Sequence, residues 1–296
     1  MLDFLIAAVL ALIMFSIGLS LRPNDFRHLI LSPKALFTGL FLQLFALPVL
    51  AFTVTGLSEI NTSFGLGFLV LAACPGGLSS NMVSFLLRAN TALAVSLTLC
   101  NSLLSVLTVP ILVNLALDRY APPGTTAHLP LIATALRICL IVLLPVLVGM
   151  AVRYLLPNLA RSVRPYTRRG ALLLLASVFL LKLFAPVQQG GSALTLLEVR
   201  SILPIALLIN VSALSLGKLA GMVLRLGRDN ELTLGVEVGI QNTSLAFLIA
   251  GTFLHNEQAL KPALIYAMFT FFTALAYGLL LKPHMREKLY ADLTGW

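Results

Sequence analysis

Long apolar runs make up most of the chain, and short polar breaks separate them. A helix that crosses the hydrocarbon core of a bilayer needs about 20 mainly apolar residues. Nine runs meet this requirement, near residues 2–21, 33–56, 63–87, 91–117, 129–155, 169–188, 201–224, 231–254 and 260–282. Pro, Gly, Asn and charged residues mark the breaks. The pattern therefore predicts an all-α polytopic membrane protein, with nine transmembrane helices in a single membrane domain over residues 1–296.

The composition agrees with a membrane protein and limits its chemistry. Apolar residues form 59% of the chain and charged residues 10%, against about 25% charged in an ordinary soluble domain. The cysteines Cys74, Cys100 and Cys139 lie in apolar runs, where a thiol behaves as a small apolar group. Neither the cysteines nor the histidines have metal-ligand spacing. We therefore expect no cofactor, and we expect no nucleic-acid partner because no basic run is interleaved with aromatic residues.

The net charge of +9 follows from an uneven distribution of basic residues between alternate breaks. If the N-terminus lies outside, fourteen of the 20 Lys and Arg residues fall on the cytoplasmic side: Arg22, Arg27, Lys34, Arg88, Arg153, Arg161, Arg164, Arg168, Arg169, Arg225, Arg228, Lys282, Arg286 and Lys288. Only Arg119, Arg200 and Lys261 fall outside. By the positive-inside rule, this bias predicts an external N-terminus, a cytoplasmic C-terminus and a location in the plasma (inner) membrane.

The first run is predicted to be a retained helix rather than a cleaved signal peptide. Asp3 is its only early charge, so it lacks a basic leading region, and it lacks a small-x-small cleavage site before Arg22.

The run over 63–87 is interrupted by Pro75, Gly76 and Gly77. Proline removes a backbone donor and glycine weakens a helix, so the pattern predicts an unwound stretch. A Ser-Ser-Asn segment follows at 79–81 and supplies oxygens beside the break. The alternative interpretation is a kinked helix whose polar side chains bond to neighbouring helices.

A second interruption lies in the run over 231–254. Glu237 is the only one of the eleven acidic residues deep inside a run, and Gly235, Gly239 and the polar stretch 241–244 surround it. A carboxylate within a membrane is costly and is by default a functional candidate. The alternative is a protonated structural acid held by hydrogen bonds.

The two interruptions fall in the third and eighth predicted helices, which cross the membrane in opposite directions. Paired interruptions in two inverted halves indicate the binding site of a secondary transporter. Half-helix N-termini present N–H groups to an anion, whereas unwound carbonyls and side-chain oxygens suit a hard cation such as sodium. The pattern therefore favours a carrier.

At these residues the chain resembles the bile acid:sodium symporter family. The motifs are 14–19 (Met-Phe-Ser-Ile-Gly-Leu), 74–77 (Cys-Pro-Gly-Gly) with Ser80 and Asn81, and 237–242 (Glu-Val-Gly-Ile-Gln-Asn), and the resemblance covers essentially the whole chain. It implies a nine-helix bacterial-type member with inverted repeats of 4 + 5 helices. It also implies two interrupted helices that cross.

The family resemblance further implies two sodium ions as coupling ions. The first site would use Ser80, Asn81, Thr98 and Glu237. The second would use Gln43, Gln241, Glu237 again, and backbone carbonyls near Val238 and Ile240. Ala94 stands where relatives often carry a hydroxyl, so the first site has one ligand fewer.

For the substrate, the resemblance implies contacts with Gly77, Leu78, Ser79 and Asn242. Leu78 replaces a polar residue common at that position. The expected substrate is a small organic anion, a carboxylate such as pantoate, a 2-oxo or 2-hydroxy acid, or a bile-acid-like compound. A panel (about 1–24 and 128–190) and a core (about 30–120 and 200–283) would move against each other in a monomeric transport unit.

The three remaining basic residues, Arg137, Lys182 and Lys218, lie within or near runs. Lys182 is close to the outer end of its run and is predicted to extend its ammonium group towards that surface. Arg137 is expected to extend its guanidinium towards a membrane surface or to form a structural ion pair. The alternative is that it serves as a counter-ion for the substrate.

Three other functions stay open on the residues alone. A proton-coupled carrier or exporter of the same superfamily would use Glu237 as its proton site. A receptor or scaffold would not require both interruptions. An intramembrane enzyme would need a base or a metal beside Ser80 or Ser244, and no intramembrane histidine or pair of aspartates accompanies them. We therefore predict a transporter rather than an enzyme.

Overall fold

The computed structural model describes residues 2–21, 33–120, 128–186 and 190–283, and most of these residues are helical. The elements are α1 (Leu2–Ser20), α3 (Pro33–Phe41), η1 (Leu42–Ala46), α4 (Leu47–Leu57), α5 (Thr62–Ala73), α6 (Leu78–Leu86), α7 (Thr91–Tyr120), α8 (Leu131–Ile138), η2 (Cys139–Leu143), α9 (Leu144–Leu155), α10 (Pro157–Phe184), α11 (Leu196–Val223), α12 (Arg228–Gly239), α13 (Thr243–Phe247), η4 (Leu248–Phe253) and α14 (Glu257–Leu281). The η elements are π-helical turns. The all-α prediction is confirmed.

Several helices are long and apolar enough to cross a bilayer. Five such stretches are Pro33–Leu57, Thr91–Tyr120, Leu131–Leu155, Leu196–Val223 and Glu257–Leu281, and shorter apolar helices cover Phe4–Ser20, Thr62–Ala73 and Thr243–Phe253. The chain is thus a multi-pass membrane protein. The predicted run at 169–188 lies in α10, which begins earlier, at Pro157, with a polar and basic first half. Residues 187 and 188 lie outside the described ranges.

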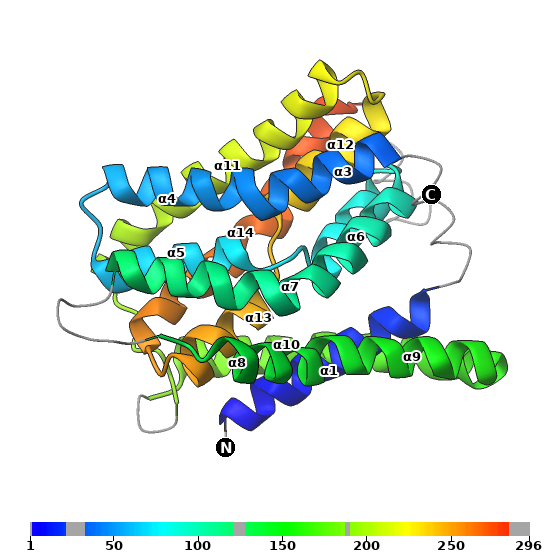
Figure 1. The fold of residues 1–296 in the computed structure, drawn as a ribbon, viewed down its shortest axis with the longest axis horizontal. Coiled ribbons are helices and arrows are strands. Elements are labelled where there is room, and N and C mark those ends of the chain that lie inside the picture. Colours follow the sequence, from blue (N-terminus) through cyan, green and yellow to red (C-terminus); the bar gives the residue numbers. More distant parts are fainter. Residues whose placement is uncertain (1, 22–32, 121–127, 187–189, 284–296) are drawn as a thin grey trace.

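The helices pack in two groups. α1 lies along α9 and α10, whereas α11 packs on α12 and α14, and α5 packs on α7 and α14. In Figure 1 the layer of α1, α8, α9 and α10 lies below α3, α4, α5, α6, α7, α11 and α12. Close approach within the lower layer depends on glycine, because a Cβ on Gly18 of α1 would lie 2.2 Å from the carbonyl oxygen of Val146 in α9. The two groups meet where α7 contacts α8, α1 contacts α13, and α10 contacts α14.

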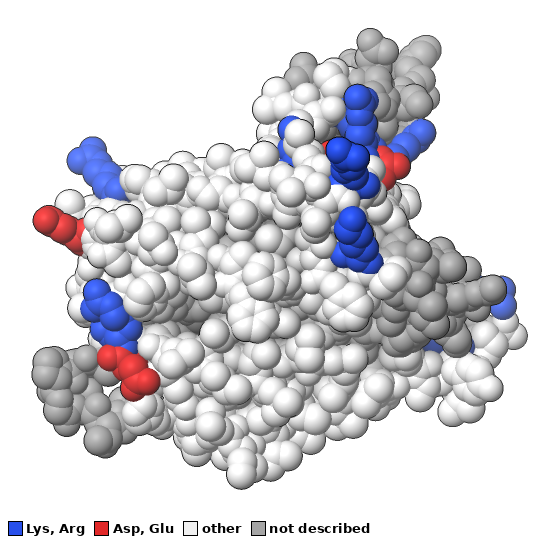
Figure 2. Space-filling model, turned by 45° about the horizontal axis from the view of Figure 1, so that its top comes forward, with Lys and Arg blue, Asp and Glu red and all other residues white. Residues whose placement is uncertain are grey.

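Basic residues gather at one end of the helices. Lys34 Nζ donates to the carbonyl of Leu224, Arg153 donates to the carbonyl of Leu19, and Lys282 pairs with Asp229. Figure 2 shows basic side chains grouped towards the right of the molecule, with few charges across its middle. The described members of the predicted cytoplasmic group thus share one end of the structure. Arg22, Arg27, Arg286 and Lys288 lie outside the described residues.

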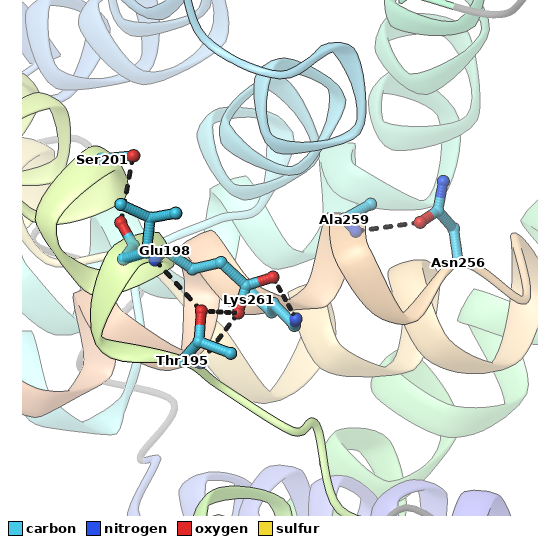
Figure 3. Close-up of polar contacts among 7 residues, drawn as sticks. Thr195, Glu198, Ser201, Asn256, Ala259 and Lys261 are labelled. Atoms are coloured by element: carbon cyan, nitrogen blue, oxygen red, sulfur yellow. Dashed lines mark hydrogen bonds and ion pairs between the residues drawn. The ribbon is translucent and has the colours of Figure 1, made fainter.

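At the opposite end, two lysines are buried in ion pairs. Lys261 of α14 pairs with Glu198 of α11, whose carboxylate also accepts from Thr195 at the start of that helix, as Figure 3 shows. Lys182 of α10 pairs with both carboxylate oxygens of Glu257 at 2.9 Å.

The prediction for Lys182 is therefore wrong. Its side chain is only 2% exposed, because a carboxylate of α14 lies within its reach and neutralises it inside the protein. Arg137, in contrast, is exposed, and its guanidinium lies over the ring of Phe253 at 5.8 Å.

Candidate functional site

The two predicted interruptions are present, and they cross. α5 ends at Ala73 and α6 begins at Leu78, while α12 ends at Gly239 and α13 begins at Thr243. Gly76 and Gln241 form an antiparallel bridge, and the amide of Asn242 donates to the carbonyl of Pro75 at 2.8 Å. The unwound backbones thus satisfy part of each other's hydrogen bonding where no helix does so.

Glu237 lies beside this crossing and is fully buried. Its Oε2 accepts from the hydroxyl of Thr98 in α7 at 3.0 Å, and that hydroxyl accepts from Asn81 Nδ2 of α6 at 3.1 Å. Ser80 also lies beside the carboxylate. The four residues predicted for the first sodium site therefore lie together, although they come from three separate helices.

Gln43 reaches the same place from the other side. Its Nε2 donates to the backbone carbonyl of Glu237 at 2.6 Å. Gln43 belongs to the π-helical turn η1. This turn is followed directly by α4, which has Pro48 in its first turn. A π turn shifts the direction of side chains relative to a regular helix, and such turns are frequent at functional sites.

Four side-chain oxygens near the crossing are buried without a hydrogen-bond donor among the residues that the structure describes. They are Gln43 Oε1, Asn81 Oδ1, Glu237 Oε1 and Gln241 Oε1. A buried oxygen without a partner is costly, and an unpaired carboxylate is more so. A hard cation with oxygen ligands would satisfy all of these groups, so the donor set fits sodium.

The carbonyls predicted for the second site are partly engaged. Val238 O accepts from Gln241 Nε2 at 2.7 Å, so the side chain and the carbonyl predicted as joint ligands bond to each other. Ile240 adopts an extended conformation at the end of α12, with φ −114° and ψ 114°. The roles of Gln241, Val238 and Ile240 as ligands stay predictions.

A cavity of about 290 Å³ adjoins the crossing. Its polar lining comes from Ser79 of α6, Gln241 and Thr243 at the second break, and Thr270 of α14. The remaining lining is apolar: Leu172, Leu175, Ala176, Phe179, Ile240, Phe247, Ala267, Met268 and Phe271. Of the residues predicted to bind substrate whose side chains the structure describes, Ser79 lines this cavity. Gly77 and Asn242 lie buried beside the crossing, and Leu78 begins α6.

Asn242 has a second role that the sequence did not reveal. Its Oδ1 accepts from the amide of Leu245 at 3.0 Å and caps α13. Asparagine is among the preferred N-cap residues, so its acceptor is used within the chain.

Sequence reasoning missed the walls of the cavity and two buried polar residues, Asn210 and Tyr266. Both donate to the carbonyl of Gly239 at 2.7 Å. One available signal was that Asn210 is a lone amide within the apolar run 201–224. The cavity residues of α10 and α14 carry no such signal, because apolar residues also face lipid.

Comparison with known proteins places these features in a family. A model described as the Sodium Bile acid symporter family matches residues 7–189, which is more than half of the chain. The chain is 27% identical to a probable sodium/metabolite cotransporter, BASS2, of Oryza sativa subsp. japonica, and the match covers 86% of this chain and 58% of that protein. It is 28% identical to the probable sodium/metabolite cotransporter BASS1 of Arabidopsis thaliana, over 86% of this chain and 61% of that protein.

A bacterial relative matches over more of its own length. It is the uncharacterized sodium-dependent transporter YocS of Bacillus subtilis (strain 168), 27% identical over 88% of this chain and 77% of that protein. The chain spans about three fifths of the length of the two plant relatives. All three are named as transporters, which agrees with the prediction of a transporter rather than an enzyme.

Proposed function

Because the chain belongs to the sodium bile acid symporter family, as its two interrupted runs predicted, we propose that it is a sodium-coupled carrier of a small organic anion. The observation that carries this proposal is the group of four buried oxygens around Glu237 that accept from no donor in the described part of the chain, at the point where the two broken helices cross. Sodium supplies the positive charge that this group lacks.

Two sodium ions fit the charges and the oxygens. The first is held by Ser80, Asn81, Thr98 and Glu237, and the second by Gln43, Gln241 and Glu237 with carbonyls at Val238 and Ile240. Gln241 turns its amide away from Val238 when the second ion binds. Two ions against one carboxylate leave about one positive charge, which a monoanion offsets. Substrate affinity should therefore rise with sodium, and sodium affinity with substrate.

The cavity indicates which anions fit. Its described lining includes no Lys or Arg, so the negative group relies on backbone amides at the start of α6 and on nearby hydroxyl and amide groups. Its apolar walls accommodate a hydrocarbon body. Pantoate, 2-oxo or 2-hydroxy acids and larger amphipathic carboxylates meet both conditions.

Transport in this proposal follows alternating access. The layer of α1, α8, α9 and α10 serves as the panel, and the remaining helices serve as the core that moves against it. The cavity lies between them, since α10 supplies one wall and α13 and α14 another. Nine spans, with the basic end in the cytoplasm and the N-terminus outside, complete the arrangement in the plasma membrane. Reporter fusions after Leu57 and after Leu159 should then report opposite sides; the same side would contradict nine spans.

A thermal-shift experiment tests the coupling ion and the substrate together. The purified protein should melt at a higher temperature in sodium than in potassium or choline at equal ionic strength and fixed pH. Carboxylates that bind should add a further increase only in sodium. Equal melting temperatures in all three salts, with uptake into vesicles driven by a pH gradient instead, would favour a proton-coupled carrier.

A further inference from the structure

The last carbonyl of α12 is held by two side chains from other helices. Gly239 O accepts from the hydroxyl of Tyr266 in α14 and from Nδ2 of Asn210 in α11, each at 2.7 Å. Both side chains are fully buried. The two donors are also within hydrogen-bond distance of each other, with Asn210 Nδ2 3.2 Å from Tyr266 Oη.

The carbonyl needs these donors because the helix stops there. The last turn of a helix leaves its carbonyls without N–H partners, and within a bilayer there is no bulk water to replace them. The amide of Ile240 still donates to the carbonyl of Val236. The next three carbonyls, those of residues 237–239, accept hydrogen bonds from side chains instead. Asn210 and Tyr266 thus take the place of the missing turn at Gly239.

A third residue fixes the orientation of the amide. The hydroxyl of Thr273, about two turns after Tyr266 in α14, donates to Asn210 Oδ1 at 2.7 Å. With its oxygen engaged in this way, the amide presents its NH₂ group to Gly239. A rotated amide would place its oxygen against the carbonyl oxygen of Gly239 and would lose the hydrogen bond that Thr273 donates.

Gly239 lies between the two side chains that matter most for the cation. Glu237 is two residues before it and Gln241 two residues after it, and each carries an oxygen that no donor among the described residues reaches. Fixing the peptide plane at Gly239 restricts how far α12 can rotate or extend. It therefore restricts where both oxygens point.

We propose that Asn210 and Tyr266, oriented by Thr273, are positioning residues for cation binding. They do not touch the ion. They hold the second break in the conformation that aims Glu237 and Gln241 at it. This inference rests on the proposed sodium coupling and adds residues from α11 and α14 to it.

The same two helices provide a matched control. Tyr277 of α14 donates its hydroxyl to the carbonyl of Leu214 in α11 at 3.2 Å, beside Gly235 rather than at the carbonyl of Gly239. Tyr277→Phe and Tyr266→Phe therefore remove the same atom, a hydroxyl of α14 that donates to the carbonyl of a neighbouring helix, which is α11 for Tyr277 and α12 for Tyr266. Only the second touches the end of α12.

The experiment measures the sodium concentration that gives half of the maximal thermal stabilisation. Tyr266→Phe should raise this concentration about five- to tenfold, the effect of a lost buried hydrogen bond expressed as affinity. Asn210→Leu should raise it at least as much. Thr273→Val should act in the same direction but less, because the amide keeps its place and loses only its orientation. Tyr277→Phe should leave it unchanged.

The outcomes separate the inference from the proposed function. If the unmodified protein shows no sodium-dependent stabilisation, the proposed coupling fails. A second outcome is that sodium stabilises the unmodified protein with the same half-saturating sodium concentration as Tyr266→Phe and Tyr277→Phe. That result would refute the positioning role and leave the proposed sodium coupling intact. A purely structural role would lower the melting temperature equally with and without sodium. Should Tyr266→Phe not fold, Thr273→Val decides the question by the same measurement.

Discussion

The two broken helices cross at one point, but they are built differently. The first break offers only backbone groups, because Pro75, Gly76 and Gly77 have no polar side chain. Gly77 therefore cannot cap α6 with a side chain. The second break carries the charged and amide side chains Glu237, Gln241 and Asn242, and Asn242 caps α13 itself. The two breaks therefore share a shape rather than a set of functional groups.

This difference assigns different partners to the two breaks. At the start of α6 the amide groups have no cap from Gly77, so they suit an anion. At the end of α12 a carboxylate and carbonyls concentrate negative charge, which suits a cation. Each break also needs the other, because Gly76 packs against the Glu237 carboxylate. Substitutions of individual residues at the crossing should then separate cation binding from anion binding.

The largest effect is expected at Glu237. A site saturated at 100 times its dissociation constant adds about 2.7 kcal/mol of stability, and Glu237→Ala should remove this increment for both ions. The sodium-free protein should remain folded and lose little, because the buried carboxylate has an oxygen without a donor and is costly to bury. Thermal shifts with and without sodium check this. Gln241→Ala, which keeps the carboxylate, should lose less of the sodium-dependent increment.

Retention of the full increment by Glu237→Ala would remove the carboxylate from both sites. Glu237→Gln is the isosteric companion variant. It can still bond to Thr98 but carries no charge, so it separates loss of charge from loss of shape.

The next effect is expected at Gly76. A Cβ there would lie 2.8 Å from Glu237 Oε2, whereas a Cβ on Gly77 would have ordinary contacts, the nearest at 3.6 Å from Asn242 Cα. Gly76→Ala should therefore weaken sodium binding about tenfold or more, which corresponds to about 1.4 kcal/mol. Gly77→Ala should leave it nearly unchanged. Sodium titrations of the melting temperature measure both, and equal affinities in the two variants would count against the crossing as the cation site.

At Asn242 the expected loss concerns the substrate. Asn242→Ala should weaken substrate binding by about 1.5–3 kcal/mol if its amide assists a charged group, and should leave sodium binding nearly intact. Calorimetric titration at saturating sodium measures this. Because the variant also loses the cap of α13, Asn242→Ser provides the control: serine keeps a capping oxygen but not the amide.

Normal affinity in Asn242→Ser would mean that Asn242 acts only as a cap. Arg137→Gln completes the comparison. If it loses more substrate affinity than Asn242→Ala, Arg137 is the counter-ion of the substrate, and the proposal that backbone amides and Asn242 hold the anion is wrong.

The smallest effect is expected at Ala94. This buried residue lies one turn before Thr98 on α7, where a hydroxyl would be on the side of the proposed first sodium site. Ala94→Ser should improve sodium affinity by about two- to fivefold, the size of a modest polar contact. A sodium titration of the melting temperature would reveal it. A weaker affinity instead would indicate that the added atom crowds Glu237 rather than binding the ion.

The sequence by itself determined where the helices break. Pro75 and two glycines in an apolar run, and glycines around Glu237 in another, leave few alternatives because a continuous helix there is energetically unfavourable. It also singled out Glu237 as a functional candidate, since a carboxylate deep in an apolar run is costly. The separation of basic residues into one end followed from the same alternation of runs.

Only the tertiary structure decided which side chains meet. Lys182 is buried because Glu257 of another helix comes within reach, and Asn210 and Tyr266 converge on Gly239 from helices far apart in the sequence. The apolar wall of the cavity is likewise invisible in the sequence, because the leucine and phenylalanine residues of α10 and α14 look the same whether they face lipid, protein or substrate. Hydropathy records how costly a residue is in water; it does not record its neighbours, and the neighbours set the chemistry here.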